Sequence, residues 1–200
     1  MAHWHRRIQT VLLLILCLML CGCKNKAAEY RMLGIEHLEK GQYREAVTKL
    51  NEALENSKGK LSEEKFDILL YRAEAEYMQG LYDDCQATLS MLKEAAGEQE
   101  AVAALQRQLD AKRLIEEASH ALDRGDAATA GEKLEAARAA GLAADRDLEF
   151  NTMVYLEKTA KWEEALEAAQ NYLARYPGDK EAEKELAFLR NRVDGLRSRK

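Results

Sequence analysis

Few side chains in this chain of 200 residues have the type and spacing that chemistry requires. The four histidines and four cysteines form no His-Glu-x-x-His or Cys-x-x-Cys motif, and His37 and His120 lack a second ligand at metal-binding spacing. A glycine-rich phosphate loop and a nucleophile elbow are also absent from the sequence. Pairs of acids, such as Glu63-Glu64, fall in the first turns of expected helices, where the helix dipole stabilises them. We therefore expect no metal, no cofactor and no enzymatic activity.

The cysteines near the N-terminus have a different context. Arg6 and Arg7 precede an unbroken apolar stretch over residues 11–20, which ends in Leu20-Cys21-Gly22-Cys23. A basic start, a short apolar core and small residues at the end are typical of a secretory signal peptide. The apolar stretch is about half the roughly 20 residues that a helix needs to cross a bilayer. Residues 1–22 are therefore predicted to be a signal peptide.

The end of this segment resembles the lipobox of bacterial lipoproteins, although Cys21 is a less usual occupant of its middle position. The resemblance implies that Cys23 is acylated and becomes the N-terminus, with residues 23–26 as a short tether. The protein would then be lipid-anchored on the extracytoplasmic face of a cell membrane, touching the membrane through its lipid only. Lys24 stands where some diderm bacteria place an aspartate that retains lipoproteins at the inner membrane, so an outer-membrane location stays open. The alternative is an ordinary cleaved signal that carries cysteines.

Charge and cysteine content of the remaining chain exclude further classes. Removing two arginines and no acids from 30 basic and 35 acidic residues leaves 28 and 35, a net charge of −7. Binding to nucleic acid requires clustered Lys and Arg, so we do not expect it. Only Cys85 remains besides Cys23, and stability must therefore come from packing instead of an intrachain disulfide.

The composition predicts an all-α protein. Ala, Leu, Glu, Lys, Arg and Gln dominate, Pro177 is the one proline, and apolar residues recur every three or four positions after Ala27. One helical pattern occurs four times. A turn at Gly41, Gly80, Gly125 or Ala160 is followed by residues at steps of three, four and three, which lie on one helical face. These residues are Tyr43, Ala46, Leu50 and Ala53; Tyr82, Cys85, Leu89 and Leu92; Ala127, Ala130, Leu134 and Ala137; and Trp162, Ala165, Ala169 and Tyr172.

This pattern resembles the tetratricopeptide repeat (TPR) family, whose unit is a helix–turn–helix pair of 34 residues. The resemblance extends over residues 27–200 and implies a right-handed α-solenoid of about four helix pairs and a capping helix from Lys180 to Arg197, capped by Asp179. A small residue on each first helix allows close packing: Gly34, Ala73, Ala118 and, less clearly, Met153.

The turns are 39, 45 and 35 residues apart, so the first two spacings exceed the family's repeat of 34 residues by several residues and the third by one. The first excess predicts a longer loop over residues 56–62, before a helix capped by Ser62. The second predicts one overlong helix that includes Val102, Leu105 and Leu109, with a short extra helix over residues 98–110 as the alternative.

In TPR arrays the first helices line a concave groove that commonly binds peptides. The resemblance implies that the groove is lined by the residues three positions before, one position after and four positions after the small residue of each first helix. It selects Arg31, Ile35 and Leu38; Leu70, Glu74 and Tyr77; Ile115, Ser119 and Leu122; and Phe150, Val154 and Glu157. Ile35 stands where a carboxylate clamp would need Asn, which disfavours a binder of terminal carboxylates. Some of these residues are also candidates for simple core packing.

The sequence thus predicts a membrane-anchored lipoprotein that binds a protein or extended peptide as a scaffold or adaptor at the bacterial cell envelope. Two alternatives stay open: an extracytoplasmic protein that binds a glycan or small ligand, and a self-associating structural spacer. The partner, its pathway and the oligomeric state are not encoded in any motif of the chain.

Overall fold

The computed structural model describes residues 25–57, 59 and 62–199, and this part of the chain is all-α. It contains nine α-helices and one π-helical turn, η1 (Arg138–Leu142), that continues from α7. The α-helices are α2 (Lys26–Glu39), α3 (Tyr43–Asn56), α4 (Glu63–Gln79), α5 (Tyr82–Ala96), α6 (Glu100–Asp123), α7 (Ala127–Ala137), α8 (Arg146–Lys158), α9 (Trp162–Arg175) and α10 (Lys180–Arg197). The predicted fold class, an all-α array of helix pairs with a C-terminal helix, is confirmed, whereas the course of the whole solenoid stays a prediction.

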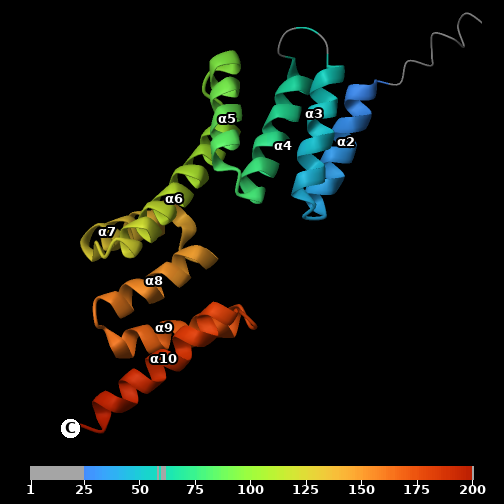
Figure 1. Ribbon diagram of the computed structural model, residues 1–200. Coiled ribbons are helices and arrows are strands. Elements are labelled where there is room, and N and C mark those ends of the chain that lie inside the picture. Colours follow the sequence, from blue (N-terminus) through green and yellow to red (C-terminus); the bar gives the residue numbers. More distant parts are fainter. Residues whose placement is uncertain (1–24, 58, 60–61, 200) are drawn as a thin grey trace, which may run out of the picture. The chain divides into compact units, whose positions relative to one another are not determined.

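The described part of the chain divides into two compact units, one up to residue 103 and the other from residue 104 onward. In the first unit α2 packs against α3, α3 against α4, and α4 against α5 (Figure 1). Its core contains Leu50 and Ile68, which are fully buried between α3 and α4, and half-buried side chains such as Tyr30 and Tyr71 pack around them. Successive helices alternate in direction, so the first helices of neighbouring pairs, α2 and α4, run parallel.

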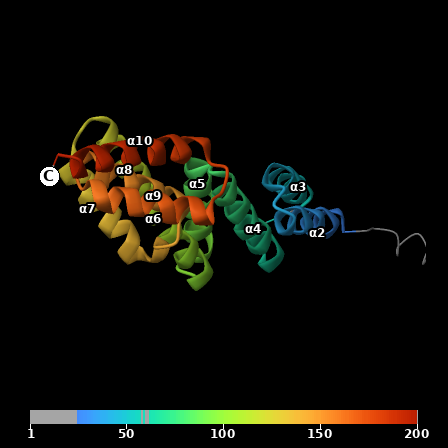
Figure 2. The ribbon, with the colours of Figure 1, turned by 90° about the horizontal axis from the view of Figure 1, so that it is seen from below.

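The second unit repeats this arrangement with the greater part of α6, then α7, α8 and α9, and adds α10. Ile115 of α6 is buried with Leu134 of α7 and Leu148 of α8. The last pair encloses Met153 and Leu189, which brings α10 into the core beside α9 (Figure 2).

The turns form where the sequence predicts them. Gly41, Gly80 and Gly125 have φ values of 70°, 80° and 75°, in the left-handed region that ends a helix and that glycine adopts without strain. Ala160 occupies the fourth turn at φ 57° and is the one non-glycine residue with positive φ in the described part of the chain. The fourth pair therefore has the same turn at a higher conformational cost.

Side-chain caps start the helices that the sequence expected to be capped. Ser62 accepts a hydrogen bond from the backbone N–H of Lys65 at the start of α4. Asp179 accepts hydrogen bonds from the N–H groups of Glu181 and Ala182 at the start of α10. Both caps satisfy donors that the first helical turn leaves unpaired.

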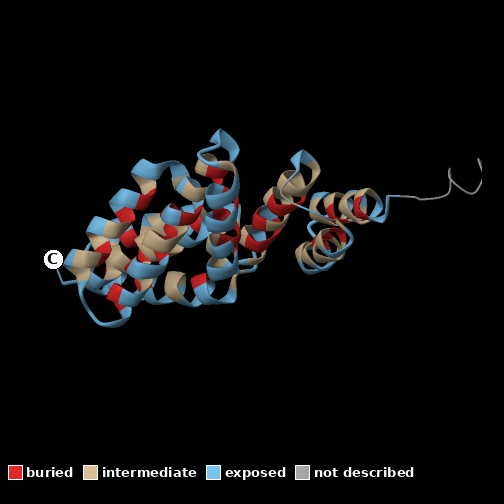
Figure 3. Ribbon diagram, turned by 90° about the horizontal axis from the view of Figure 1, so that it is seen from above, coloured by how far each residue is buried: buried red, intermediate tan, exposed pale blue. Residues whose placement is uncertain are grey.

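Buried residues form stripes along the helices (Figure 3), and the small residues of the repeat pattern are among the buried ones. Gly34 is buried, and a Cβ atom at this position would lie 2.6 Å from Cγ of Leu50. The buried small positions on the other helices are Ala46, Ala73, Cys85, Ala118, Ala130 and Ala165.

The region between the second and third turns forms a single helix. α6 extends over 24 residues from Glu100 to Asp123, so the overlong helix is confirmed and no separate short helix is present at residues 100–110. Within the described ranges, no helix is both long and apolar enough to cross a membrane.

Candidate functional site

The first unit contains a groove between the two parallel first helices, α2 and α4. Arg31 of α2 forms an ion pair with Asp67 of α4 at 2.9 Å, and the side-chain amide of Asn25 donates to Glu64 at 3.2 Å. These contacts join the N-terminal ends of the two helices. Further along, the helices leave a hollow of about 320 Å³ between them.

Apolar and aromatic side chains make up most of this hollow, which we call the α2–α4 groove. Leu38 and Tyr71 form the floor of the groove, and their positions are held by packing against the buried core that contains Leu50 and Ile68. Met78 is 48% exposed at the edge of α4. The lining residues are Ile35, Leu38, Glu39, Tyr43, Tyr71, Glu74 and Met78.

Two carboxylates give the groove its charge. Glu39 and Glu74 are both exposed and form no ion pair or side-chain hydrogen bond within the described residues. The nearest lysine in sequence, Lys40, is engaged elsewhere, since its Nζ donates to Glu36 and lowers the pKa of that carboxyl. The lining includes no Lys, Arg or His.

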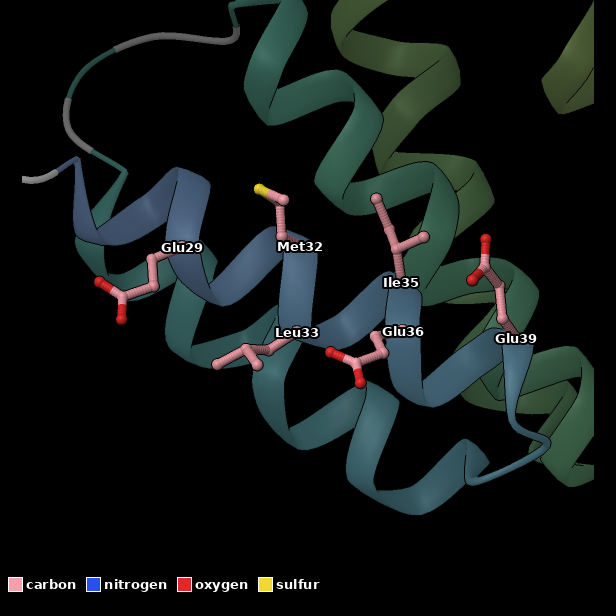
Figure 4. A pocket seen from close by; sticks show the side chains of 6 residues that line it. All are labelled: Glu29, Met32, Leu33, Ile35, Glu36 and Glu39. Atoms are coloured by element: carbon pink, nitrogen blue, oxygen red, sulfur yellow. The ribbon is translucent and has the colours of Figure 1, made fainter.

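A second hollow adjoins the groove on α2. Its described lining consists of Glu29, Met32, Leu33, Ile35, Glu36 and Glu39, so that Ile35 and Glu39 belong to both hollows. Figure 4 shows Met32, Ile35 and Glu39 on one side of α2, and Glu29, Leu33 and Glu36 on the other. Met32 is 69% exposed, which is the largest exposure among the exposed large apolar side chains of the described chain.

The predicted site residues of the first unit are partly brought together. Ile35, Leu38 and Glu74 line the groove. Arg31 is held in its ion pair with Asp67, Leu70 is half-buried on α4, and Tyr77 contacts the ring of Tyr82 at a centroid distance of 5.9 Å. These last three residues lie outside the lining of the groove.

Four lining residues were missed from the sequence. Glu39 and Met78 both stand five positions after the small residue of their helix, Gly34 and Ala73. The predicted stripe would have included both residues if it had been extended to the fifth position after each small residue. Tyr43 is the first residue of its repeat pattern but belongs to the second helix of its pair, whereas the predicted stripe includes first helices only. Tyr71 precedes Ala73 by two residues, at a position that the repeat pattern does not mark.

In the second unit the predicted groove residues are more enclosed. Ile115 and Leu122 are buried, at 2% and 4% exposure. Phe150 and Val154 are half-buried against the core that includes Leu189 of α10, and the Phe150 ring meets that of Tyr172 edge-on at 5.7 Å. Ile115 and Leu122 therefore serve as core residues here, and α10 covers part of the fourth pair.

The two remaining predicted residues of this unit are half-buried. Ser119 lies on α6, and Glu157 lies on α8 beside Glu185 of α10. Burial raises the pKa of Glu157, and the neighbouring Glu185 carboxyl raises it further. Two acidic groups at this helix contact favour a proton shared between them over two full charges.

A polar cluster at the start of α8 and α10 holds the second unit together. The Arg146 guanidinium donates to the Tyr172 hydroxyl at 3.0 Å and to Asp179 at 2.8 Å, and the Tyr172 hydroxyl donates to Asp179 at 2.7 Å. These hydrogen bonds, together with the α10 backbone N–H groups, keep the pKa of Asp179 well below its usual range.

Lys112 of α6 forms the other strong ionic contact of this unit. Its Nζ lies 2.6 Å from Asp145 and 2.9 Å from Asp147, at the start of α8. Burial alone would lower the pKa of Lys112, but hydrogen bonds to both carboxylates outweigh that effect and raise it. The charges of this cluster are thus engaged in joining helices.

The first unit has a polar network in its interior that the sequence analysis did not find. Arg72 donates to Thr88 at 2.7 Å and to Asn51 at 3.2 Å, and the Thr88 hydroxyl donates to Glu76 at 2.7 Å. Burial raises the pKa of Glu76, although the Thr88 hydrogen bond and Arg72 act in the opposite direction. The network links α3, α4 and α5 and contains none of the groove residues.

The remaining predictions about chemistry concern single cysteines and metal ligands. Cys23, the predicted lipidation site, lies outside the described residues. Cys85 is fully buried in α5, which suits its small position in the repeat. No cluster of three or more potential His, Cys, Asp or Glu ligands occurs in the part of the chain that the structure describes.

Comparison with known proteins agrees with the repeat pattern. Residues 37–109 match the model of the tetratricopeptide repeat family. The match covers about a third of the chain, and the packed helix pairs of the whole described chain are TPR-like. TPR proteins generally mediate protein–protein interactions and are typically non-catalytic scaffolds.

Among solved structures the chain is similar to MamA. One crystal form of MamA AMB-1 is 18% identical, with 86% of this chain and 91% of that chain covered and a TM-score of 0.37. A second crystal form of MamA AMB-1 is also 18% identical, with 84% of this chain and 82% of that chain covered and a TM-score of 0.37. A MamA mutant is 18% identical as well, with 84% of this chain and 88% of that chain covered and a TM-score of 0.38. No curated protein matches the chain.

Proposed function

We propose that this protein is a membrane-anchored, non-catalytic scaffold that binds another protein, or an extended peptide, in the α2–α4 groove. The observation that carries the proposal is the hollow of about 320 Å³ between two first helices, lined by Ile35, Leu38 and Glu74 from the predicted stripe. Ligand sites are concave, mostly apolar and equipped with a few polar groups, and this groove has all three properties.

The size and floor of the groove favour side chains of a peptide over a flat protein surface. The volume lies at the low end of the range for ligand pockets, and suits a few side chains of an extended segment. Leu38 and Tyr71 are anchored in the core, so a partner would meet a preformed surface and lose little free energy to its rearrangement. Exposed Met78 adds an adaptable apolar contact at the edge.

Photo-crosslinking in intact cells tests the groove. The crosslinking residue replaces Met78, and the matched control replaces Met91 of α5, because both methionines belong to the first unit and are 48% and 49% exposed. We expect a discrete protein adduct from position 78 and none from position 91. Equal adducts at both positions, or none at position 78 in folded protein, would contradict a protein-binding groove.

The membrane part of the proposal depends on the N-terminal sequence. Leu20-Cys21-Gly22-Cys23 after a basic and apolar segment supports cleavage before Cys23 and acylation of its thiol. The scaffold would then act at the extracytoplasmic face of a cell membrane, with the covalent lipid as its one non-protein group.

Membrane fractionation of a Cys23→Ala variant tests the anchor. We expect the variant to leave the membrane fraction and a Cys85→Ala variant to stay in it, since Cys85 is buried in α5. Persistence of the Cys23→Ala protein at the membrane would refute the lipid anchor and leave the groove proposal intact.

A further inference from the structure

The α2–α4 groove is acidic as well as apolar, and this combination restricts what it can bind. We infer that it selects a segment in which an apolar side chain lies next to a lysine or arginine, and that it discriminates against acidic segments. The inference rests on the proposed function, because it names the chemistry of the partner for the same groove.

The charge of the groove is uncompensated. Glu39 and Glu74 come from two different helices and line the same hollow, and none of its described lining residues is basic. Two basic residues near Glu39 in sequence are already engaged, Arg31 with Asp67 and Lys40 with Glu36. A cationic side chain of a partner could therefore form ion pairs with both carboxylates without displacing an existing ion pair.

The apolar lining suits the stem of such a cation. Lys and Arg pack their methylene groups along apolar surfaces while the charged end stays in a polar environment. Met78 and Ile35 offer that surface, and Tyr43 and Tyr71 add aromatic rings, which attract cations through their faces. An apolar neighbour in the partner would occupy the rest of the hollow.

The adjoining hollow on α2 continues the same chemistry. Met32 and Leu33 lie there between Glu29 and Glu36, of which Glu36 is paired with Lys40, and Ile35 and Glu39 are shared with the groove (Figure 4). A second copy of the chain docked on this face would bring like charges together, which costs free energy. A segment with alternating apolar and basic side chains complements the whole track.

The inference also explains why a terminal carboxylate is a poor ligand here. A carboxylate clamp needs basic and amide donors, whereas this groove presents Ile35 and two carboxylates. The guanidinium of Arg31, the predicted groove residue with a positive charge, is held by Asp67.

Fluorescence anisotropy with the full chain in mild detergent tests this selectivity. The probes are four short labelled peptides of equal length: alternating Leu and Lys, Leu and Gln, Leu and Glu, and Ser and Lys. We expect the Leu–Lys peptide to bind best, the Leu–Glu peptide worst, and added salt to weaken the Leu–Lys peptide more than the Leu–Gln peptide.

Two pairs of variants assign the effect to the groove. The double variant Glu39→Gln/Glu74→Gln should weaken Leu–Lys binding about fivefold, the combined effect of two ion pairs at exposed carboxylates, and leave Leu–Gln binding unchanged. Its control, Glu55→Gln/Glu94→Gln, removes the same charge from exposed positions of α3 and α5 and should change neither. Ile35→Ser should weaken both Leu peptides, and Met91→Ser should weaken neither.

The outcomes separate the two proposals. If Ile35→Ser weakens binding but the Leu–Glu peptide binds as well as the Leu–Lys peptide, the charge inference is overturned and the groove remains. If the control pair Glu55→Gln/Glu94→Gln weakens Leu–Lys binding as much as the groove pair, the attraction is due to net charge and the inference is also overturned. If Ile35→Ser and Met91→Ser have the same effect, the proposed groove itself fails.

Discussion

The corresponding helix faces of the two units differ in how far they are covered. In the first unit, Ile35 and Leu38 face a hollow that no described residue fills. In the second unit, Leu122 occupies the same repeat position as Leu38 but is buried, and Val154 corresponds to Ile35 but packs against the core beside α10. The repeat pattern therefore identifies the face of a helix, while the neighbouring elements decide whether that face is open.

Their polar groups are used differently as well. Charged side chains of the second unit join helices, as Lys112 does with Asp145, and Arg146 with Asp179. In the first unit Arg31 and Asp67 likewise join α2 and α4, but Glu39 and Glu74 at the groove form no ion pair with any described residue. The first unit thus combines apolar surface with carboxylates that are free to pair with a partner, which is the basis of the proposed groove.

Truncation of a core side chain of α10 should destabilise the second unit and expose the predicted groove face of α8. Leu189 is fully buried with Met153, Ala165 and Ala169. Leu189→Ala should lower the free energy of unfolding by about 2–5 kcal/mol, because it deletes buried methyl groups and leaves a cavity. Urea denaturation measures the loss, and faster amide exchange in α8 would show that its predicted groove face has become accessible.

Phe188→Ala is the control for this prediction. Phe188 is adjacent in sequence but 48% exposed, and its main aromatic contact is with Trp162 at 6.4 Å. A loss of about 1 kcal/mol is expected from that contact. Equal losses for the two variants would mean that α10 does not close the core of the second unit.

The close approach of α2 and α3 beneath the groove can be tested with one methyl group. In Gly34→Ala the new Cβ would lie 2.6 Å from Cγ of Leu50, a branched atom that is fully buried. Overpacking of this kind costs about 1–3 kcal/mol, which exceeds the gain of about 1 kcal/mol in helix propensity. We expect a net loss of stability by urea denaturation and weaker binding in the groove.

Two further variants isolate the steric cause. Gly195→Ala in α10 introduces the same methyl where no heavy atom lies within 4 Å, and should stabilise the protein slightly. In a Leu50→Ala background, the cost of Gly34→Ala should shrink, because the clashing atoms are gone. An undiminished cost there would contradict the packing explanation.

Much of the fold could be predicted because each element depends on local sequence. Gly41, Gly80 and Gly125 mark turns by their conformational freedom, and Ser62 and Asp179 mark helix starts by their hydrogen bonds. Periodic apolar residues identify buried faces in the same way. The overlong α6 followed from unbroken periodicity, since no turn residue interrupts it.

The site was less predictable because it depends on contacts between helices. The stripe predicted Ile35, Leu38 and Glu74 but could not show that Arg31 is held by Asp67, a residue 36 positions away. Burial of Ile115 depends on Leu134 and Leu148, which come from later helices. The local sequence determines which face of each first helix could line a groove, and contacts with later helices determine which part of that face stays accessible.

The contact between α8 and α10 should respond to pH. The pKa of Glu157 is raised by burial and by Glu185, so the folded state binds this proton more tightly than the unfolded state, whose pKa is near the ordinary value of 4.5. Its contribution to stability is fully present below that pH and is lost as the pH rises through the higher folded pKa. Glu157→Gln mimics the protonated form and should therefore stabilise the protein increasingly as the pH rises above 4.5.

Urea denaturation of this variant and its parent across the acidic and neutral range measures the difference. Glu181→Gln is the control, since Glu181 is exposed in the first turn of α10. A Glu157→Gln effect that does not change with pH would show that Glu157 and Glu185 do not share a proton at this contact.

The smallest expected effect concerns the turn that distinguishes the last helix pair from the first three. Ala160 has φ 57°, where a side chain costs about 1–2 kcal/mol relative to glycine. Replacing Ala160 with glycine removes this cost, but glycine also makes the unfolded chain more flexible, which offsets part of the gain in stability. Ala160→Gly should therefore stabilise the protein by about 0.5–1 kcal/mol.

Gly125→Ala is the reciprocal test in the third pair. Its φ is 75° and a Cβ there would meet nothing within 4 Å, so the loss of stability would come from the backbone conformation alone. Opposite and similar changes in the urea midpoint for the two variants would show that all four turns adopt one backbone geometry, three with glycine and one against the preference of its residue. A destabilised Ala160→Gly protein would mean that the Ala160 methyl makes contacts worth more than the strain, and the four turns would then not be equivalent.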